Sequence, residues 1–127
     1  MTKRIIRKIP RKKIIGRNQT VEILQFDLVH SQQLYRNLRV NDEEKCQCQG
    51  ILKQYFREHC SRHGGKLRHW AGDGGHAIFS ISHKVGNSID AAKEIIAHLD
   101  DLLKAQIADY LRLGNDPFEI EIRMSIH

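Results

Sequence analysis

The chain has 127 residues, of which 40% are hydrophobic and 28% are charged. These values are typical of one globular domain with its own core. No apolar run approaches the roughly 20 residues of a membrane-spanning helix, and the first residues lack the apolar segment of a secretory signal. The chain has three cysteines, including Cys46 and Cys48. This odd number argues against a disulfide framework and favours a reducing cytoplasm.

Basic residues are concentrated at the N-terminus. Residues 1–20 hold eight of the 21 Lys and Arg residues and no acid, which leaves 13 basic residues against the 15 acidic ones in the remainder. We therefore expect a basic arm over residues 1–20 and one domain over residues 21–127. Such an arm can bind nucleic acid or an anionic membrane surface, pack on a partner, or remain solvated. No recognition motif accompanies the charge, so the sequence does not favour a nucleic-acid partner.

The first predicted strand covers Val21–Leu28 and contains Asp27 near its end. Apolar residues occur on both of its alternations, which indicates a central strand buried on both faces. Two helices follow in the prediction. Ser31 is a candidate N-cap for a short helix that ends at about Leu38. Asn41 then begins a longer helix that ends at residue 64, with a capping-box glutamate three residues after it.

A glycine-rich hairpin comes next, with strands near residues 66–71 and 76–82. Its turn contains Gly72, Asp73, Gly74 and Gly75, so up to three positions can adopt a positive φ without a Cβ clash. Asp73 lies at the tip of this turn, where it is well placed for a metal ion or a substrate. Because Asp-Gly is also the commonest hairpin turn, a purely structural role for Asp73 stays open.

One long helix and one strand complete the prediction. Ser88 is a candidate N-cap for the helix, which the Gly-Asn-Asp-Pro sequence at 114–117 ends. Its continuous apolar stripe consists of Ile89, Ala92, Ile95, Ile96, Leu99, Leu102, Leu103, Ile107, Tyr110 and Leu111. Residues 118–127 alternate between apolar and polar types. This alternation predicts a strand with one buried and one solvated face.

The predicted order is β-α-α-β-β-α-β, which indicates an α+β fold. A ferredoxin-like sheet with its helices packed on one face fits this order. In that topology the first strand lies beside the hairpin, so Asp27 lies beside Asp73. Two carboxylates suit two divalent metal ions on a polyphosphate, because Mg²⁺ usually takes one or two carboxylates and leaves its other positions to water and phosphate. The free N–H groups at the start of the first helix, from Val29 to Gln32, can hold phosphate oxygens.

Four segments of the chain resemble class III nucleotidyl (adenylate/guanylate) cyclases. The first is FDLVHSQQL, which is similar to the family's F-x-D-I-x-G-S-T, and the second is HGGKLRHWAGDGGHAIF, which is similar to its H-G-G…K-x-x-G-D…F hairpin. The third is AAKEIIAHLDDL, which resembles the family's third helix, and the fourth is IEIRMSIH, which resembles its L-R-I-G-I-H strand. These segments run in the family's order from about Val21 to His127.

The resemblance implies a two-metal site and a cyclisation reaction. Asp27 and Asp73 would bind two Mg²⁺ or Mn²⁺ ions, and the backbone carbonyl of Leu28 would assist one of them. The turn that receives the β and γ phosphates would consist of Val29, His30, Ser31 and Gln32. A metal-activated ribose 3′-hydroxyl would attack the α-phosphate of a nucleoside triphosphate. The products would be pyrophosphate and a 3′,5′-cyclic nucleotide for signalling.

The chain also departs from the family pattern at three positions. His30 and Gln32 replace the family's Gly and Thr, and His69 replaces the lysine that specifies adenine. Adenine selectivity is therefore unsupported, and His69 is a candidate base-binding residue or a strand residue that faces solvent. The family includes anti-phage (Pycsar-type) cyclases that make cyclic pyrimidine nucleotides and lack this lysine. The histidine at position 69 fits that group.

The resemblance covers only the N-terminal portion of the family domain. The family domain continues with elements that carry a second base contact and the Asn and Arg of the transition state. In that family two cyclase domains pair head to tail, so each active site combines residues from both domains. We therefore expect a homodimer or pairing with another cyclase domain, and little or no activity from residues 1–127 alone, because such donors contribute orders of magnitude in rate.

Two alternatives remain open. The first is a catalytically degenerate cyclase-like module for nucleotide binding or dimerisation, which His30, Gln32, His69 and the missing half favour, whereas the two intact aspartates favour an enzyme. The second is a zinc site on the longer predicted helix. Its candidate ligands would be Cys46, Cys48, His59, Cys60 and His63. A C-x-C pair on a helix directs its thiols about 200° apart, so packed side chains are the favoured interpretation.

Overall fold

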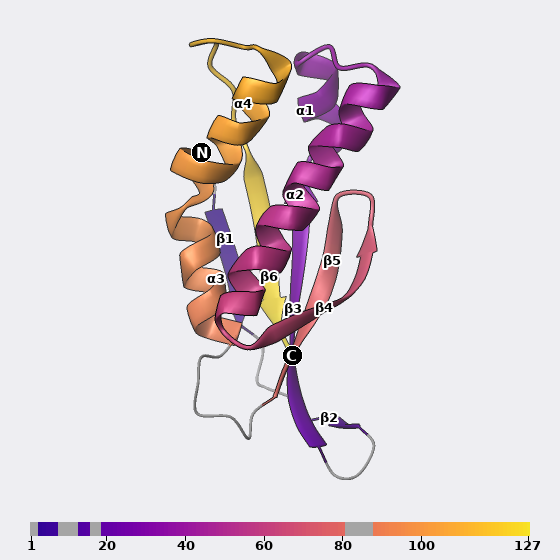
Figure 1. Cartoon of the computed structure of the whole chain (residues 1–127), viewed down its shortest axis with the longest axis vertical. Coiled ribbons are helices and arrows are strands. Elements are labelled where there is room, and N and C mark those ends of the chain that lie inside the picture. The colour runs from indigo at the N-terminus through magenta and orange to yellow at the C-terminus, as the bar shows by residue number, and fades with distance from the viewer. Residues whose placement is uncertain (1–2, 8–12, 16–18, 81–87) are drawn as a thin grey trace.

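The computed structural model describes residues 3–7, 13–15, 19–80 and 88–127, and it consists of one sheet with helices against one of its faces (Figure 1). The strands are β1 (Lys3–Arg7), β2 (Lys13–Ile15), β3 (Gln19–Val29), β4 (Gly65–Ala71), β5 (Gly74–Ser80) and β6 (Glu121–Ile126). The helices are α1 (Ser31–Asn37), α2 (Asp42–Arg62), α3 (Ser88–Ala97), the π-helix η1 (Leu99–Lys104) and α4 (Ala105–Leu111). In this described part of the chain, no helix combines the length and apolar character needed to span a membrane.

The strands lie in the order β1-β6-β3-β5-β4. Within the run β6-β3-β5-β4 each adjacent pair is antiparallel, and in chain order these are the fourth, first, third and second strands of the predicted unit. This is the ferredoxin-like order with helices on one face, so the predicted fold class is confirmed. The predicted second hairpin strand reached residues 81–82, which lie outside the described residues.

Parts of the basic N-terminal stretch pair with the sheet. β1 adds to the edge of the sheet parallel to β6, with Lys3 opposite Ile122. β2 forms an antiparallel pair with the first residues of β3, with Ile15 opposite Gln19. Composition indicated only an arm here, and it did not predict this pairing. The domain boundary drawn at residue 20 stays a prediction.

β3 is the central strand, as predicted, but it is buried on one face only. Leu24, Phe26 and Leu28 are buried, whereas Gln25 is exposed and Asp27 is only partly buried. The expectation of burial on both faces is therefore wrong. The helices cover one face of the sheet (Figure 1). Because Gln25 and Asp27 alternate with the buried residues of β3, their side chains lie on the uncovered face.

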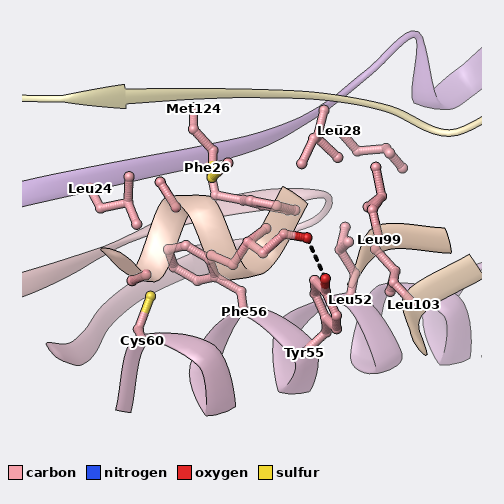
Figure 2. Close-up of a cluster of buried hydrophobic side chains, with 14 of the residues drawn as sticks. Leu24, Phe26, Leu28, Leu52, Tyr55, Phe56, Cys60, Leu99, Leu103 and Met124 are labelled. Atoms are coloured by element: carbon pink, nitrogen blue, oxygen red, sulfur yellow. Dashed lines mark hydrogen bonds between the residues drawn. The ribbon is translucent and has the colours of Figure 1, made fainter. Parts of the chain in front are cut away.

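The core lies between this covered face and α2. Figure 2 shows Phe26 and Phe56 in it, with ring centroids 5.0 Å apart. Trp70 adds a third ring whose centroid is 6.1 Å from that of Phe26. The Tyr55 hydroxyl donates a hydrogen bond to the Ile95 carbonyl, which joins α2 to α3 (dashed line in Figure 2). These contacts fix β3 against the helices and thereby fix the position of its C-terminal end.

The predicted starts of the first two helices differ in outcome. The capping box at α2 is confirmed, because the Asn41 side chain accepts from the Glu44 N–H at 2.8 Å and the Glu44 carboxylate accepts from the Asn41 N–H at 2.9 Å. Ser31 is not the N-cap of α1. That position belongs to His30, whose φ of 55° lies in the left-handed region and whose side chain makes no capping hydrogen bond.

The predicted long helix is interrupted by the π-helix η1. Along the whole helical region from α3 to α4, the buried residues Ile95, Leu99, Leu103 and Ile107 are spaced by four. In a regular α-helix each step of four residues would rotate the buried face by about 40°. The wider π turn rotates less per residue, so it keeps these side chains on the core. Leu102 and Tyr110 were predicted in the stripe but are 36% and 40% exposed.

The end of the helical region and the last strand differ from the prediction in their bounds. α4 ends at Leu111, before the predicted stop at 114–117, because Arg112 already has a left-handed φ of 54°. β6 begins at Glu121 and not at residue 118. Within β6 the predicted alternation is confirmed, since Ile122, Met124 and Ile126 are buried and Arg123 is exposed.

Candidate functional site

Asp27 and Asp73 lie on paired segments at one end of the sheet. Asp27 is near the end of β3, directly opposite Gly74 on β5. Asp73 occupies the two-residue turn between β4 and β5, and its carbonyl accepts a hydrogen bond from the Leu28 N–H at 3.0 Å. This bond fastens the hairpin tip to the end of β3. The fold therefore brings together the two aspartates that the sequence placed 46 positions apart.

The glycines of the hairpin permit this close approach. A Cβ on Gly74 would lie 2.6 Å from the Phe26 carbonyl oxygen and 3.3 Å from Asp27 Oδ1. A Cβ on Gly75 would lie 2.1 Å from the His69 carbonyl oxygen. The predicted turn covered Gly72 to Gly75 and allowed a positive φ at up to three positions. In the structure only Gly72 among these four residues has a positive φ, at 59°. Gly74 and Gly75 are required for space rather than for φ.

A pocket of about 520 Å³ opens beside the two aspartates on the uncovered face of the sheet. Side chains that line it include Asp27, Ser31, His69, Asp73, His76 and Arg123. The pocket thus contains the two predicted metal-binding aspartates, the predicted base-binding residue and one predicted phosphate-binding residue, whereas Leu28, the third predicted metal ligand, is buried and does not line it. Polar groups dominate its wall, which suits a charged and hydrated ligand.

Arg123 is a functional candidate that the sequence did not single out. Its Nη2 donates to Asp27 Oδ2 at 3.0 Å, and the two residues lie directly opposite each other on β6 and β3. Both side chains are about half exposed. The alternation of the last strand had already placed Arg123 on its polar face. The sequence did not predict the register in which β6 pairs with β3, and this pairing is what places Arg123 opposite Asp27.

Tyr35 is the second candidate that the sequence missed. Its hydroxyl donates a hydrogen bond to Asp73 Oδ1. Tyr35 belongs to α1 and is only 6% exposed. Burial raises the pKa of Tyr35, and the hydrogen bond to Asp73 raises it further, so the hydroxyl remains a donor at neutral pH. No local sequence signal predicts this contact, because 38 residues separate its partners.

The predicted phosphate-binding turn is divided between two pockets. Ser31 lines the pocket that holds the aspartates, whereas Val29 and His30 line a second one of about 410 Å³. Gln32 is exposed on α1 and lines neither. The left-handed φ of His30 gives a physical reason for the family's glycine at this place, since glycine adopts it without a Cβ penalty.

Two histidines face each other across the hairpin. His69 on β4 lies directly opposite His76 on β5, and their ring centroids are 5.6 Å apart. The register of the two strands shifts between Leu67 and His69, which marks a bulge just before His69. Both histidines line the pocket, and His69 is exposed, so both interpretations of His69 stay open: a base-binding residue or a strand residue that faces solvent.

The donor set fits a hard divalent cation that also binds phosphate. Asp27 and Asp73 supply carboxylates, and the Arg123 guanidinium already supplies a positive charge at Asp27. Among the described residues, no cluster of three or more His, Cys, Asp or Glu side chains suits a metal ion. Mg²⁺ and Mn²⁺ sites on nucleotides do not require such a cluster, because phosphates and water supply the remaining ligands.

The helix proposed for zinc offers no comparable donor set. Cys48 and Cys60 are buried in the core. Burial raises the pKa of Cys60 to about 12 and that of Cys48 to about 11, so both thiols stay protonated at neutral pH. Zinc binds the thiolate, and these two thiols are therefore packing groups.

Solved structures of two cyclases share this fold. The guanylyl cyclase Cya2 superimposes with a TM-score of 0.59 at 21% sequence identity, and the alignment covers 84% of this chain and 53% of that one. The adenylyl cyclase CyaB from P. aeruginosa superimposes with a TM-score of 0.60 at 16% identity, and the alignment covers 84% of this chain and 54% of that one. No protein-family model and no curated protein sequence matches the chain.

At these identities the comparison establishes the fold. The chain has a class III cyclase-like fold and spans about half the length of each of the two cyclases. The similarity to their fold is consistent with the sequence resemblance described above.

Proposed function

We propose that this chain is the metal-binding half of a nucleotidyl cyclase domain. The domain would convert a nucleoside triphosphate into a 3′,5′-cyclic nucleotide and pyrophosphate. The observation that carries the proposal is the convergence of Asp27 and Asp73 in one polar pocket, joined by the bond from Leu28 N–H to the Asp73 carbonyl. The fold that the chain shares with the cyclases Cya2 and CyaB supports the proposal.

Each pocket residue has a distinct task in this proposal. Asp27 and Asp73 bind two Mg²⁺ or Mn²⁺ ions, and the Leu28 carbonyl assists one of them. Two divalent ions, when bound, activate the ribose 3′-hydroxyl and stabilise the departing pyrophosphate. Arg123 releases Asp27 when a cation takes its place, and its guanidinium then contacts a phosphate oxygen.

The remaining tasks are phosphate and base recognition. The turn formed by Val29, His30, Ser31 and Gln32 holds the β and γ phosphates, and Ser31 supports this role most directly because it lines the pocket. His69 contacts the base, with His76 stacked beside it. An imidazole in place of the lysine removes the adenine-specific contact, which fits the pyrimidine-producing anti-phage (Pycsar-type) group. The base itself is left to measurement.

A complete site needs a second domain. The chain spans only about half of the solved cyclases that it resembles, so the transition-state donors would come from a further segment or from a partner. We propose head-to-tail pairing with a second copy or with another cyclase domain. Three free cysteines favour a reducing cytoplasm as the location.

The test is a product assay. The chain, alone and mixed with a protein that carries the complementary half of a class III cyclase domain, is incubated with Mn²⁺ and each of ATP, GTP, CTP and UTP. Mass spectrometry should detect one 3′,5′-cyclic nucleotide in the mixture, and Asp27→Ala and Asp73→Ala should abolish it. If a nucleotide binds but no mixture yields a cyclic product, the proposed enzymatic function is contradicted.

A nucleotide-binding or dimerisation module without turnover is the second candidate function. One observation favours it: both aspartates already have hydrogen-bond partners, Arg123 for Asp27 and Tyr35 for Asp73. A degenerate site can retain such contacts in place of metal ions. Metal-independent nucleotide binding, or dimerisation that survives loss of both aspartates, would favour this candidate.

A further inference from the structure

The hairpin tip that carries Asp73 is held by three hydrogen bonds. The Asp73 carbonyl accepts from the Leu28 N–H at 3.0 Å, and the Gly72 carbonyl accepts from Trp70 Nε1 at 2.9 Å. Both of these bonds fix the backbone. The third, from the Tyr35 hydroxyl to Asp73 Oδ1, is the one that fixes the side chain.

We propose that Tyr35 is the positioning residue for Asp73, orienting its carboxylate so that Oδ2 is presented to a divalent cation. This inference rests on the proposed function, since it takes Asp73 as a metal ligand. Tyr35 touches neither metal nor nucleotide in the proposal and acts only through Asp73. Nothing in the sequence resemblance assigns it a role.

The surroundings of Tyr35 make its hydroxyl a rigid donor. The side chain is 6% exposed, and the ammonium of Lys45 lies 5.8 Å from the centre of its ring. A buried ring has few rotamers, so the hydroxyl stays at one place relative to the hairpin. Asp73 in a two-residue turn at the surface would otherwise rotate freely about its side-chain bonds. A fixed donor removes that freedom before a cation binds.

The bond also sets the position of α1 relative to the carboxylate. Tyr35 lies one turn of helix after Ser31, which lines the same pocket. The hydroxyl bond therefore couples the segment proposed to hold phosphates to the residue proposed to hold metal. Hydrogen bonds of this kind to metal-binding carboxylates typically contribute 10- to 100-fold in metal affinity.

The chain offers a matched pair of variants for the test. Tyr35→Phe removes the hydroxyl from Asp73 and keeps the ring. Tyr55→Phe also removes one hydroxyl from a buried tyrosine, but that hydroxyl donates to the Ile95 carbonyl between α2 and α3. Mn²⁺ alone is the probe, and free Mn²⁺ is measured by electron paramagnetic resonance during titration of each protein. Circular dichroism verifies that each variant is folded.

We expect Tyr35→Phe to weaken Mn²⁺ binding by roughly 10- to 100-fold, with Tyr55→Phe within about twofold of the wild type. A double variant, Tyr35→Phe with Asp73→Ala, should bind no more weakly than Asp73→Ala alone, because Tyr35 acts through Asp73. Wild-type affinity in Tyr35→Phe, equal losses in both tyrosine variants, or a further loss in the double variant would each overturn the proposal.

The titration separates this inference from the proposed function. If Asp27→Ala and Asp73→Ala lose Mn²⁺ binding while Tyr35→Phe keeps it, the metal site stands and the role of Tyr35 is wrong. If both aspartate variants bind Mn²⁺ as the wild type does, or if the wild type binds none, then both the proposed metal site and the proposed role of Tyr35 are wrong. For a Tyr35→Phe protein that fails to fold, Tyr35→Leu provides a smaller apolar side chain without a hydrogen-bond donor, with the same expected loss.

Discussion

Arg123 Nη2 donates to Asp27 Oδ2 at 3.0 Å, between residues that face each other directly across β6 and β3. The contact places a positive charge on one of the two carboxylates proposed to bind metal. A cation that binds Asp27 must therefore displace the guanidinium. Both side chains are about half exposed, so solvent screens the pair and the displacement costs little.

The first prediction concerns Arg123→Gln. Because an exposed ion pair contributes about 0–1 kcal/mol, the free energy of unfolding should change by no more than about 1 kcal/mol. Mn²⁺ affinity without nucleotide should rise by up to about fivefold, since the competing charge is gone. Affinity for a Mn²⁺–nucleoside triphosphate should fall by about tenfold or more, because a charged hydrogen bond to phosphate contributes about 1.5–3 kcal/mol. Calorimetric titration measures both affinities.

Arg57→Gln is the matched control, because Arg57 is exposed on α2 and remote from the pocket. It should leave both affinities unchanged. If the two arginine variants behave alike, the Arg123–Asp27 pair has no part in metal or nucleotide binding.

A second prediction compares two glycines. At Gly75 a Cβ would lie 2.1 Å from the His69 carbonyl oxygen, so Gly75→Ala should force the hairpin strands apart and destabilise the protein by roughly 1–3 kcal/mol. At Gly50, exposed in α2, a Cβ meets no atom within 4 Å, so Gly50→Ala should stabilise by about 0.5–1 kcal/mol. Urea unfolding measures both. Equal effects of the two substitutions would contradict the close packing of the hairpin.

The third prediction is a pH dependence of stability from His59. This imidazole is 1% exposed, its Nδ1 lies 2.8 Å from the Tyr55 carbonyl, and its Nε2 has no hydrogen-bond partner. Burial lowers the pKa of His59, and nearby Arg62 and His98 lower it further, although Glu94 and the Tyr55 carbonyl oppose them. The unfolded chain therefore binds this proton more readily than the folded one does. The contribution of His59 to the free energy of unfolding is therefore fully present above about pH 6.5 and is lost as the pH falls below that value.

Urea midpoints between pH 8 and pH 5 test this dependence. His59→Leu should flatten the fall below pH 6.5, whereas His30→Asn, at an exposed histidine, should keep it. Glu94 contributes in a lower range. His63, whose Nε2 lies 3.0 Å from a Glu94 carboxylate oxygen, lowers the pKa of Glu94, so that part of the stability is lost only as the pH falls below about 4.5. An unchanged slope above pH 5 in His59→Leu would refute the assignment.

A fourth prediction distinguishes the three thiols. Cys46 is exposed, whereas Cys48 and Cys60 are buried, and burial raises the pKa of both. Because the thiolate is the reactive form, a maleimide at pH 7 should label the folded protein once and the urea-unfolded protein three times. Intact mass spectrometry counts the adducts. Rapid labelling of two or three thiols in the folded state would contradict the packing of α2 on the sheet.

The fold was predictable where local patterns and topology rules agree. The capping box at Asn41, the hairpin turn at Asp73 and the alternation of β6 each have a local cause. The ferredoxin-like connection then makes β3 the neighbour of β5. The π-helix η1 was not predictable in the same way, because an apolar spacing of four also fits an α-helical stripe that widens gradually. Pairing of β1 with β6 is long-range, and the basic composition of β1 obscured it.

The candidate site was only partly predictable for a related physical reason. Asp27 and Asp73 were found because motifs and topology place them together. Their partners Arg123 and Tyr35 come from a distant strand and from the inner face of α1, and neither has a local signature. His30 was expected to contact phosphate. That role stays a prediction, and the structure adds that His30 adopts the left-handed φ between β3 and α1, a backbone requirement that residue type alone does not reveal.

The central claim is that Asp27 and Asp73 form one metal-dependent nucleotide site. The most direct test is calorimetric titration of the chain with ATP, GTP, CTP and UTP, in the presence and absence of Mn²⁺. At least one nucleotide should bind only with Mn²⁺, and Asp27→Ala and Asp73→Ala should each abolish that binding. Asp116→Ala, at an exposed aspartate after α4, should leave it intact. Nucleotide binding that needs no metal or survives loss of both aspartates, or no binding at all, would contradict the account.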